Sequence, residues 1–150
     1  MKERLATRTV LLDREGRVAI LKVDKFDYYK IPGGGVEEDE DILVAARREV
    51  LEEAGCECKI VEQLGEMVTD IPDWGMRDVS RGFVAQVMGE KSVPNFDDFE
   101  RERGFSLAWV ESLKTAIELL AKHEPRDTSA RQLQERDLEF LKRASVALSS

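Results

Sequence analysis

The segment from Asp41 to Gly55, with the sequence DILVAARREVLEEAG, has the features of one amphipathic helix. Asp41 is a favourable N-cap residue, and Gly55 is typical of the position at which a helix ends. Apolar side chains recur between them at helical spacing, at Ile42, Leu43, Ala46, Val50 and Ala54. The segment therefore predicts a helix that packs along one side and leaves its other side chains available for function.

The same helix carries three glutamates in an arrangement that its own stability does not explain. Glu49, Glu52 and Glu53 are spaced i, i+3 and i+4, so their like charges repel by about 0.2 to 0.5 kcal/mol per pair. They also occupy the last turns, where the helix dipole disfavours anions. Arg48 lies four residues before Glu52, which is the weaker orientation for a helical ion pair. We therefore expect positive charge to be supplied from outside the chain.

Strands are predicted on both sides of this helix. Two segments, ATRTVLL and RVAILKV, lie between Ala6 and Val23 and are separated by DREG, which predicts a hairpin. A third short strand, YYKI, runs into Pro32 and the glycines at 33–35, where a loop is expected. Beyond the helix, strands are predicted near Lys59–Thr69, Val79–Met88 and Phe105–Val110, with polar loops between them.

The C-terminal third has helical periodicity. One helix is predicted at TAIELLAKH and another at SARQLQERDLEFLKRASVAL, in which Leu133, Leu138, Phe140 and Leu141 supply a packing face. No internal repeat or low-complexity linker divides the chain, and a length of 150 residues suits one compact domain. We therefore expect a single α/β domain over residues 1–150.

The charge balance argues against several classes of partner. The chain has 31 acidic and 23 basic residues, a formal net charge of −8, which disfavours nucleic acid and anionic membranes. An anionic substrate would need a metal ion as mediator. No apolar run is long enough to span a membrane, and MKERLATRTV lacks the apolar core of a signal peptide, so a cytoplasmic protein is expected. Cys56 and Cys58 suit neither a disulfide framework nor a zinc site.

The glutamates belong to a longer pattern, G-x5-E-x7-R-E-U-x-E-E-x-G-U, where U is a bulky apolar residue. The residues that fit it are Gly34, Glu40, Arg48, Glu49, Val50, Glu52, Glu53 and Gly55. This pattern resembles the Nudix box, the signature of the Nudix hydrolases, and its many fixed offsets make the match specific. Two positions depart from the family: Cys56 replaces a usual Ile, Leu or Val, and Asp39 replaces a common glycine.

The resemblance implies a Nudix-type α/β/α sandwich with a mixed β-sheet, and Mg²⁺-dependent hydrolysis of a phosphoanhydride bond, with Mn²⁺ as a substitute. Magnesium prefers oxygen ligands, and it can neutralise phosphate oxygens and activate the attacking water. By resemblance, the metal ligands are Glu49, Glu52, Glu53 and a backbone carbonyl of the loop at Gly33 and Gly34. Glu40 and Arg48 are supporting residues, and Arg48 is expected to orient a carboxylate by an ion pair.

The general base varies in this family between a glutamate of the box and an acid of an outer loop. The segment NFDDFERERG is predicted to be that loop, with Glu100 preferred over Asp97, Asp98 and Glu102. Gly34 and Gly35 are expected to let the backbone approach the substrate closely. Tyr28, Tyr29 and Trp74 are candidates to stack on a base, with packing in or beside the core as the alternative. Trp109 is expected in the core, and His123 is not expected to be catalytic.

The pattern does not identify the group attached to the diphosphate. Nudix hydrolases cleave nucleoside triphosphates, ADP-ribose, nucleotide sugars and dinucleoside polyphosphates, and Pro72 lies near where ADP-ribose-cleaving members often have a proline. We therefore predict cleavage of a nucleoside diphosphate linked to another moiety, preferably ADP-ribose or a nucleotide sugar, by a monomer or homodimer. The alternative is a Nudix-like module that binds a nucleotide or a partner protein without catalysis. Such modules typically lose carboxylates of the box, all of which are present here.

Overall fold

The computed structural model describes residues 1–149. Its strands are β1 (Lys2–Leu12), β2 (Val18–Val23), β3 (Tyr28–Lys30), β4 (Gly33–Gly35), β5 (Glu57–Ile71), β6 (Met76–Met88) and β7 (Phe105–Val110). Its α-helices are α1 (Ile42–Ala54), α2 (Asp98–Glu102), α3 (Leu113–Lys122) and α4 (Thr128–Leu148). Two short 3-10 helices, η1 (Asp24–Phe26) and η2 (Pro72–Trp74), lie in connections between strands.

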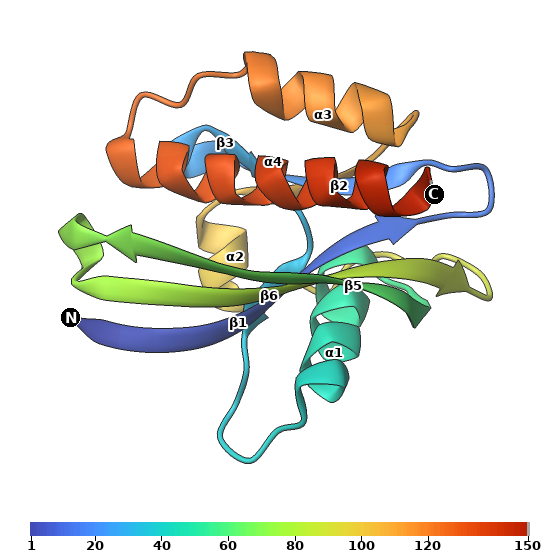
Figure 1. The fold of residues 1–150 in the computed structure, drawn as a ribbon, viewed down its shortest axis with the longest axis horizontal. Helices are drawn as coiled ribbons and strands as arrows, with labels where there is room; N and C mark the ends of the chain where they lie inside the picture. The colour runs from blue at the N-terminus through green and yellow to red at the C-terminus, as the bar shows by residue number, and fades with distance from the viewer. Residues whose placement is uncertain (150) are drawn as a thin grey trace.

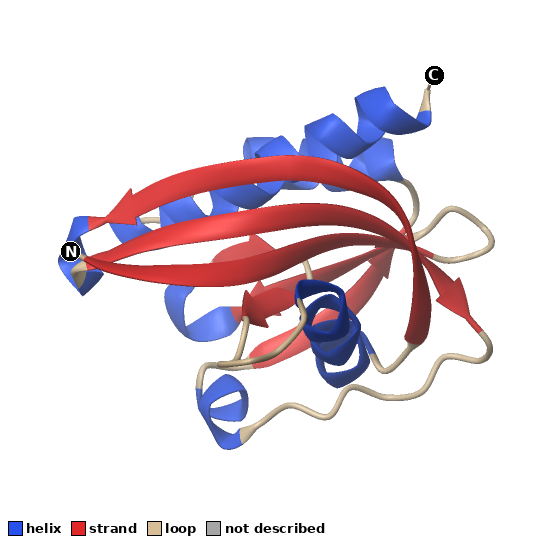
Figure 2. Ribbon diagram, turned by 60° about the horizontal axis from the view of Figure 1, so that its bottom comes forward, coloured by secondary structure: helices blue, strands red, loops and turns tan. Residues whose placement is uncertain are grey.

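The strands form one curled, mixed sheet with helices on both faces (Figure 1). The order along the sheet is β3-β2-β1-β6-β5, with β4 added to β1 and β7 added to β2. Helix α1 covers one face, and α3 and α4 lie together on the other, as the second view shows (Figure 2). The predicted α/β/α sandwich with a mixed sheet is therefore confirmed.

Strand β1 is the central element of this sheet. It runs parallel to β6 from Lys2↔Met76 to Leu12↔Gln86, and its middle residues, Ala6 to Arg8, also pair with β4. The predicted hairpin with β2 is reduced to one pair, Leu12↔Val18, because β2 pairs instead with β7 over its whole length. The sheet thus opens beside β1, and the glycine strand β4 lies in that opening, next to α1.

Helix α1 begins and ends where the sequence predicts. The Asp41 carboxylate accepts hydrogen bonds from the first turn, and Gly55 ends the helix with a φ of 68°. Only glycine fits there, because an added Cβ would lie 2.3 Å from the carbonyl oxygen of Ser92. The buried face contains Ala45, Ala46, Val50 and Ala54, together with Glu49 and Glu53. The helix therefore buries two of its glutamates among apolar side chains.

Several predicted boundaries need correction. Strands β1, β5 and β6 are longer than predicted, because β5 and β6 form a continuous antiparallel hairpin that extends beyond the core. The acidic segment near position 100 is not wholly a loop, since it contains the short helix α2. Asp39, at the position where related boxes often have glycine, has a left-handed φ of 63°. Glycine adopts that conformation without a steric penalty, which explains its frequency at this position.

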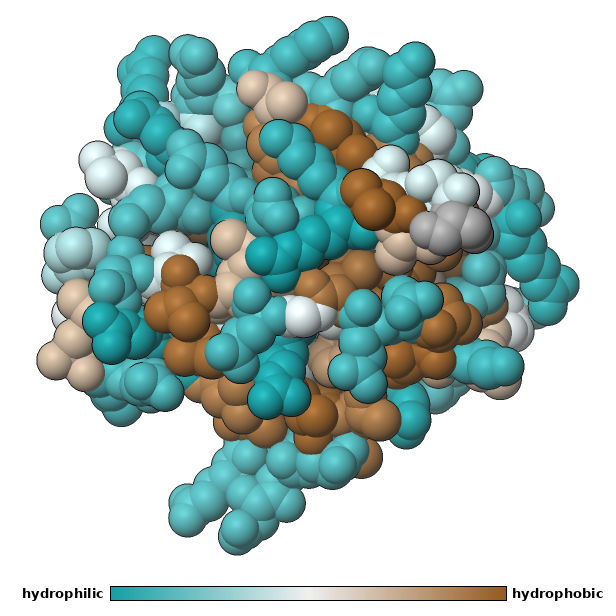
Figure 3. Space-filling model, viewed as in Figure 1, coloured by the Kyte–Doolittle hydropathy of each residue, from teal (hydrophilic) through white to brown (hydrophobic). Residues whose placement is uncertain are grey.

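The core lies between the sheet and α3–α4, with a smaller cluster beneath α1. Phe140, Leu141 and Ala144 of α4 are fully buried against Val10 and Ile20 of the sheet. On the face of the molecule that Figure 3 shows, hydrophobic residues gather in patches between hydrophilic side chains. Within residues 1–149, no helix is long and apolar enough to cross a membrane.

Candidate functional site

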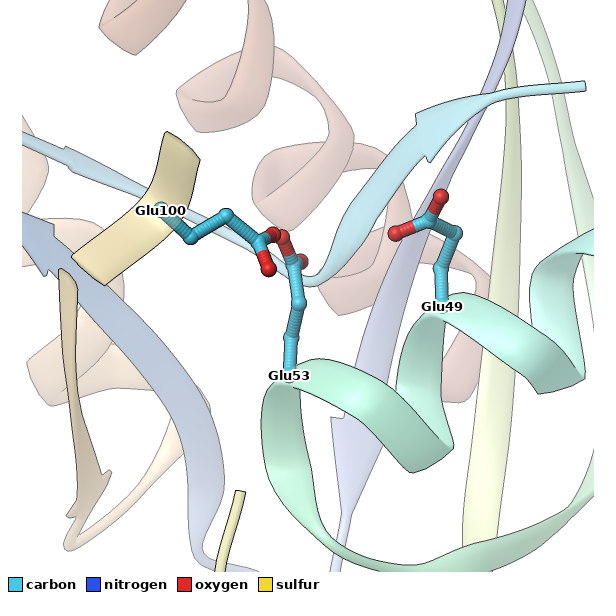
Figure 4. A group of neighbouring side chains, drawn as sticks. All are labelled: Glu49, Glu53 and Glu100. Carbon is cyan, nitrogen blue, oxygen red and sulfur yellow. The ribbon is translucent and has the colours of Figure 1, made fainter. Parts of the chain in front are cut away.

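Two glutamates project from the buried face of α1 toward the opening beside β1. Glu49 is 7% exposed and Glu53 is 1% exposed. They lie on successive turns of α1, and Glu100 approaches Glu53 from α2 (Figure 4). Glu52 belongs to the same helix, but its side chain is 39% exposed. The structure therefore places Glu49 and Glu53 near Glu100, which is distant in sequence, and leaves the neighbouring Glu52 more exposed.

The carboxylate of Glu53 is fixed by Lys30 and by the glycine loop. Nζ of Lys30 donates to Oε1 and Oε2 of Glu53 at 3.0 and 3.2 Å, and also to the carbonyl oxygen of Gly33 at 3.1 Å. The backbone N–H of Gly33 donates to Oε1 of Glu53 at 2.9 Å. These bonds fix both the helix and the loop around one carboxylate, so its position is well defined before any ligand binds.

Arg48 connects the next group of acids. Its Nε and Nη2 donate to both oxygens of Glu40, at 2.8 and 2.9 Å, and Nη2 also donates to the carbonyl oxygen of Gly35 at 3.0 Å. Nη1 donates to Oε1 of Glu49 at 3.0 Å and lies 3.6 Å from Glu52. This pairing lowers the pKa of Glu40 to about 2, and it directs the Glu49 carboxylate toward the glycine loop.

Helix α2 brings a third buried acid to Glu49 and Glu53. Asp97 caps this helix by accepting a hydrogen bond from the backbone N–H of Glu100, and the Glu100 side chain accepts one from the N–H of Asp97. The reciprocal bonds fix the direction of the Glu100 side chain. One carboxylate oxygen each from Glu49, Glu53 and Glu100 lie within 4.8 Å of one another.

This crowding changes the acidity of the glutamates. Burial raises the pKa of Glu53 to about 7; Lys30 opposes the rise, whereas a hydrogen bond with Glu100 adds to it. Burial, followed by the charge of Glu53, raises the pKa of Glu49. Burial and the charge of Glu49 raise the pKa of Glu52. Each shift means that Lys30 and Arg48 do not fully offset the cost of burying these ionised groups beside one another.

A divalent cation fits this donor set. Three buried carboxylates within 4.8 Å of one another supply oxygen ligands of the kind that Mg²⁺ and Mn²⁺ prefer. The positive charges nearest to them are Lys30 and Arg48, and Arg48 is already paired with Glu40. A bound cation would therefore replace repulsion between Glu49, Glu53 and Glu100 by shared attraction.

These acids line one side of a cleft of about 410 Å³. The cleft collects side chains from β1, β3, β4, β6, α1, α2 and α4, so residues distant in sequence face one space. Its basic residues are Arg4, Arg8, Lys30, Arg48, Arg103 and Arg136. The sequence shows no basic run, yet the fold gathers these cations in the cleft that the glutamates line.

A family model described as the NUDIX domain matches residues 2–132 of the chain. The chain belongs to the Nudix family. Among curated proteins, an RNA pyrophosphohydrolase of Bradyrhizobium diazoefficiens is 39% identical over 59 residues, which cover 39% of this chain and 32% of that protein. An RNA pyrophosphohydrolase of Rhodopseudomonas palustris is 35% identical over 85 residues, covering 52% and 47%. The matched region thus spans less than half the length of either relative.

The Nudix fold is also found in solved structures. A NUDIX hydrolase from Nitrosomonas europaea superimposes with a TM-score of 0.73 at 19% sequence identity, covering 97% of this chain and 90% of that one. At this identity the likeness concerns the fold alone. It agrees with the curled mixed sheet and with the position of α1 in this Nudix chain.

The predicted site residues of the Nudix box are placed as follows. Gly33, Gly34, Gly35, Arg48, Glu49, Glu52 and Glu53 all line the cleft, as does Glu100. Tyr28 also lines it, whereas Tyr29 does not. The Tyr29 ring packs against His123, with 5.0 Å between ring centroids, because neighbouring residues of a strand point to opposite faces. Trp74 is at the cleft, and Trp109 packs beside the cluster beneath α1.

Sequence reasoning missed Lys30 and the arginines of the cleft. Lys30 lies in YYKI, a strand otherwise expected to be buried, and a charged residue in such a strand is a signal for a buried partner. The partner itself could not be read from the sequence, because Glu53 lies on another element. Cys56 and Cys58 are both buried and free.

Proposed function

We propose that this chain hydrolyses a phosphoanhydride bond of a nucleotide derivative, using Mg²⁺ or Mn²⁺ bound by the glutamates of the cleft. The observation that carries the proposal is the meeting of three buried carboxylates at a well-defined glycine loop. When bound there, a divalent cation would neutralise phosphate oxygens and increase the acidity of the attacking water. The membership of the Nudix family and the names of the curated relatives support hydrolysis of such a bond.

The protein groups have distinct roles in this proposal. Glu49 and Glu53 supply oxygen ligands, and Glu52 supplies a further carboxylate at the more exposed side of the cleft. Lys30 holds Glu53 in place. Glu100 is our candidate for the general base, because its carboxylate reaches the centre of the site from a different element than the others (Figure 4).

A second role belongs to the backbone of the glycine strand. An added Cβ at Gly34 would lie 2.5 Å from Oε1 of Glu49, so only glycine lets the chain pass this close to the carboxylate. The peptide groups at Gly34 and Gly35 can therefore approach phosphate oxygens bound at the glutamates. Arg48 supports this geometry by linking Glu40, Glu49 and the carbonyl of Gly35.

Two classes of substrate follow from different observations. Pro72 begins η2 in the β5–β6 hairpin and is followed by Trp74, which lines the cleft, so this hairpin can contact the moiety beyond the diphosphate. This is our reason for including ADP-ribose and nucleotide sugars. The relatives are named RNA pyrophosphohydrolases, which adds RNA carrying a 5′ phosphoanhydride. Nucleoside triphosphates share the same bond and remain in the set.

A substrate panel tests this proposal. The protein is incubated with Mg²⁺ and ADP-ribose, a nucleotide sugar, nucleoside triphosphates or 5′-triphosphorylated RNA, and the products are separated to identify the cleaved bond. Glu53→Gln serves as the matched control and should lower turnover by about two orders of magnitude or more, since it removes a buried ligand. Hydrolysis that survives in this variant, or turnover unaffected by EDTA, would contradict the proposed site.

The alternative function is a module that binds a nucleotide without turnover. It predicts tight binding of the same compounds with no product in the presence of Mg²⁺. All the carboxylates of the box are present, and two of them are held in the cleft with raised pKa values. A binding module has no need to bury acids that destabilise the metal-free protein, so we prefer catalysis.

A further inference from the structure

A second charged cluster lies in the wall of the cleft, on the face of β1 that α4 covers. Arg8 of β1 and Arg136 of α4 have side chains that are 6% and 2% exposed. Asp78 of β6 bridges them, since Arg8 Nη2 lies 3.5 Å from Oδ1 and Arg136 Nη1 lies 3.3 Å from Oδ2. Arg8 Nε donates to Ser80 Oγ at 3.2 Å, and Arg136 Nε donates to Asp137 Oδ1 at 2.8 Å.

Stability alone does not account for this cluster. Removing four charges from water carries a large desolvation penalty, and replacing a buried ion network by apolar residues of similar volume is often neutral or stabilising. Arg8, Asp78 and Arg136 line the cleft together with Tyr28. Its position indicates a role in recognising what the cleft binds.

Each arginine retains donor groups that face the cleft. Among residues 1–149, no hydrogen bond engages Nη1 of Arg8 or Nη2 of Arg136. Neither nitrogen is sealed from solvent, because in the same range the fully buried side-chain atoms without a partner are the hydroxyls of Thr7 and Thr9. Both arginines line the cleft. Their unpaired N–H groups are therefore available to a ligand.

The cluster offers these donors without a net positive charge. Arg8 and Arg136 are balanced by Asp78 and Asp137, and the second oxygen of Asp137 accepts from the backbone N–H of Ile31. A phosphate placed there would add negative charge beside the carboxylate of Asp78. A neutral acceptor, such as a ring carbonyl or ring nitrogen, satisfies the donors without that penalty.

Aromatic rings line the same cleft. Trp74 and Phe99 are 46% and 58% exposed, and the guanidinium of Arg103 lies 3.8 Å from the centre of the Phe99 ring. Aromatic rings in the same cleft as these donors suit a planar heterocycle, since bases stack on aromatic side chains. The cleft therefore combines a site for a diphosphate at the glutamates with the elements of a base-binding pocket.

We propose that Arg8 and Arg136 read the base of the nucleotide and select guanine over adenine. This inference rests on the proposed function, because it specifies the substrate of that site. Guanine presents two neighbouring acceptors, O6 and N7, on one edge, whereas adenine presents the N6 amino donor beside N7. The two arginines supply donors only, so the N6 amino donor of adenine would face a guanidinium donor with no acceptor between them. Asp78, Ser80 and Asp137 are positioning residues that fix the two guanidinium planes.

The first test compares GMP with AMP in the presence of Mg²⁺ by isothermal titration calorimetry. The two ligands carry the same charge and no phosphoanhydride bond, so their affinity ratio reports the base alone. We expect GMP to bind about tenfold more tightly or better, the range of discrimination given by a well-placed arginine. Equal affinities, or tighter binding of AMP, would overturn the proposal. This comparison uses the unmodified protein, so it is decisive even if a variant fails to fold.

The second test uses Arg8→Lys and Arg136→Lys. Lysine keeps the positive charge next to Asp78 but cannot supply the planar fork of donors. Each variant should bring the ratio of GMP to AMP affinity to within about twofold of one. Arg143→Lys is the control, since Arg143 is on the same helix but donates to the carbonyls of Leu64 and Glu66 and does not line the cleft. Retention of the full ratio in both cleft variants would overturn the assignment.

The experiments can contradict the proposed function and the proposed base preference independently of each other. A GMP preference without hydrolysis of GTP or any other panel compound in Mg²⁺ would support base reading and contradict the proposed enzyme. Equal affinity for GMP and AMP, together with equal kcat/KM for GTP and ATP, would support the enzyme and contradict base reading.

Discussion

Nζ of Lys30 lies 3.0 Å from Oε1 and 3.2 Å from Oε2 of Glu53, and both side chains are buried. Lys30 belongs to β3 and Glu53 to the last turn of α1, so the ion pair joins a strand to the helix that carries the site. The same ammonium group donates to the carbonyl oxygen of Gly33. Lys30 therefore determines both the charge balance of the site and the position of the glycine loop.

Lys30→Met should be strongly destabilising in metal-free buffer at pH 8. It leaves the Glu53 carboxylate buried without its cation, and breaking a buried pair in this way costs about 3 to 5 kcal/mol. Urea unfolding in EDTA measures the loss. Lys22→Met is the control, because Lys22 pairs with the exposed Asp27 at 2.9 Å and such pairs contribute at most about 1 kcal/mol. Similar losses in both variants would mean that the Glu53 pair has no special role.

Alanine at Gly34 should lower activity with little loss of stability, whereas alanine at Gly33 should lower the stability of the protein. At Gly34, the new Cβ would lie 2.5 Å from Oε1 of Glu49, a flexible group that can move away, so turnover should fall at least tenfold with little loss of stability. At Gly33, the Cβ would lie 2.0 Å from the backbone oxygen of Thr7, which disrupts the pairing of β1 with β4. Overpacking of this kind costs about 1 to 3 kcal/mol or more.

Steady-state kinetics and urea unfolding of both alanine variants check this contrast. Gly35→Ala serves as the control for stability, because the three atoms nearest to its Cβ all belong to the flexible side chain of Arg4, from 3.0 Å. If Gly34→Ala unfolded as readily as Gly33→Ala, the close approach at Gly34 would be structural and not a feature of the site.

Helix α1 could be predicted because its signals are local. Asp41 and Gly55 fix its ends, and the apolar period fixes its buried face. The cluster of Glu49 and Glu53 follows from the same period, and Asp97 with Glu100 forms a capping box, S/T/D-x-x-E, that is readable in the sequence. The short helix α2 was nevertheless predicted as a loop, because five residues give too little periodicity to recognise.

Features that depend on distant pairing could not be predicted. Strand β1 pairs in parallel with β6, and no local sequence feature of either strand identifies the other as its partner. Arg8 and Arg136 become neighbours only through that pairing and the packing of α4. The orientation of Tyr29, in contrast, was predictable from the sequence. The two-residue period of a strand implies that Tyr29 cannot share a face with Tyr28.

The stability of the metal-free protein should fall as the pH rises from 5 to 8. The pKa of Glu53 is raised from 4.5 to about 7, so in this range the folded protein binds more protons than the unfolded chain. The contribution of protonated Glu53 is complete below about pH 4.5 and is lost as the pH passes 7. The shift corresponds to a change on the order of 3 kcal/mol.

Unfolding free energies at pH 5 and pH 8 in EDTA measure this change. Glu53→Gln lacks the titrating group, so the difference between wild type and variant isolates its contribution from those of other acids. A variant whose stability decreased with pH as steeply as that of wild type would show that Glu53 is already ionised at pH 5.

Adding Mg²⁺ should reverse the order of stability between wild type and Glu49→Gln. In EDTA at pH 8, Glu49→Gln should melt at or above the wild-type temperature, because it removes a buried charge that repels Glu53. Glu53→Gln should melt below wild type in that buffer, because it leaves Lys30 buried without its carboxylate. A ligand that binds only the folded state stabilises it by about 2.7 kcal/mol at a hundredfold excess over Kd. Wild type should show this gain in millimolar Mg²⁺, and the two variants should gain clearly less.

Two further variants make this experiment specific. Glu52→Gln should lose only part of the gain, because Glu52 is more exposed and lies outside the group of three carboxylates within 4.8 Å. Glu62→Gln, an exposed change on β5, should melt like wild type in both buffers. If Glu49→Gln were instead destabilised in EDTA, and both it and Glu53→Gln gained as much from Mg²⁺ as wild type, the carboxylates would be structural. Their ion pairs with Arg48 and Lys30 would then be the reason for their burial.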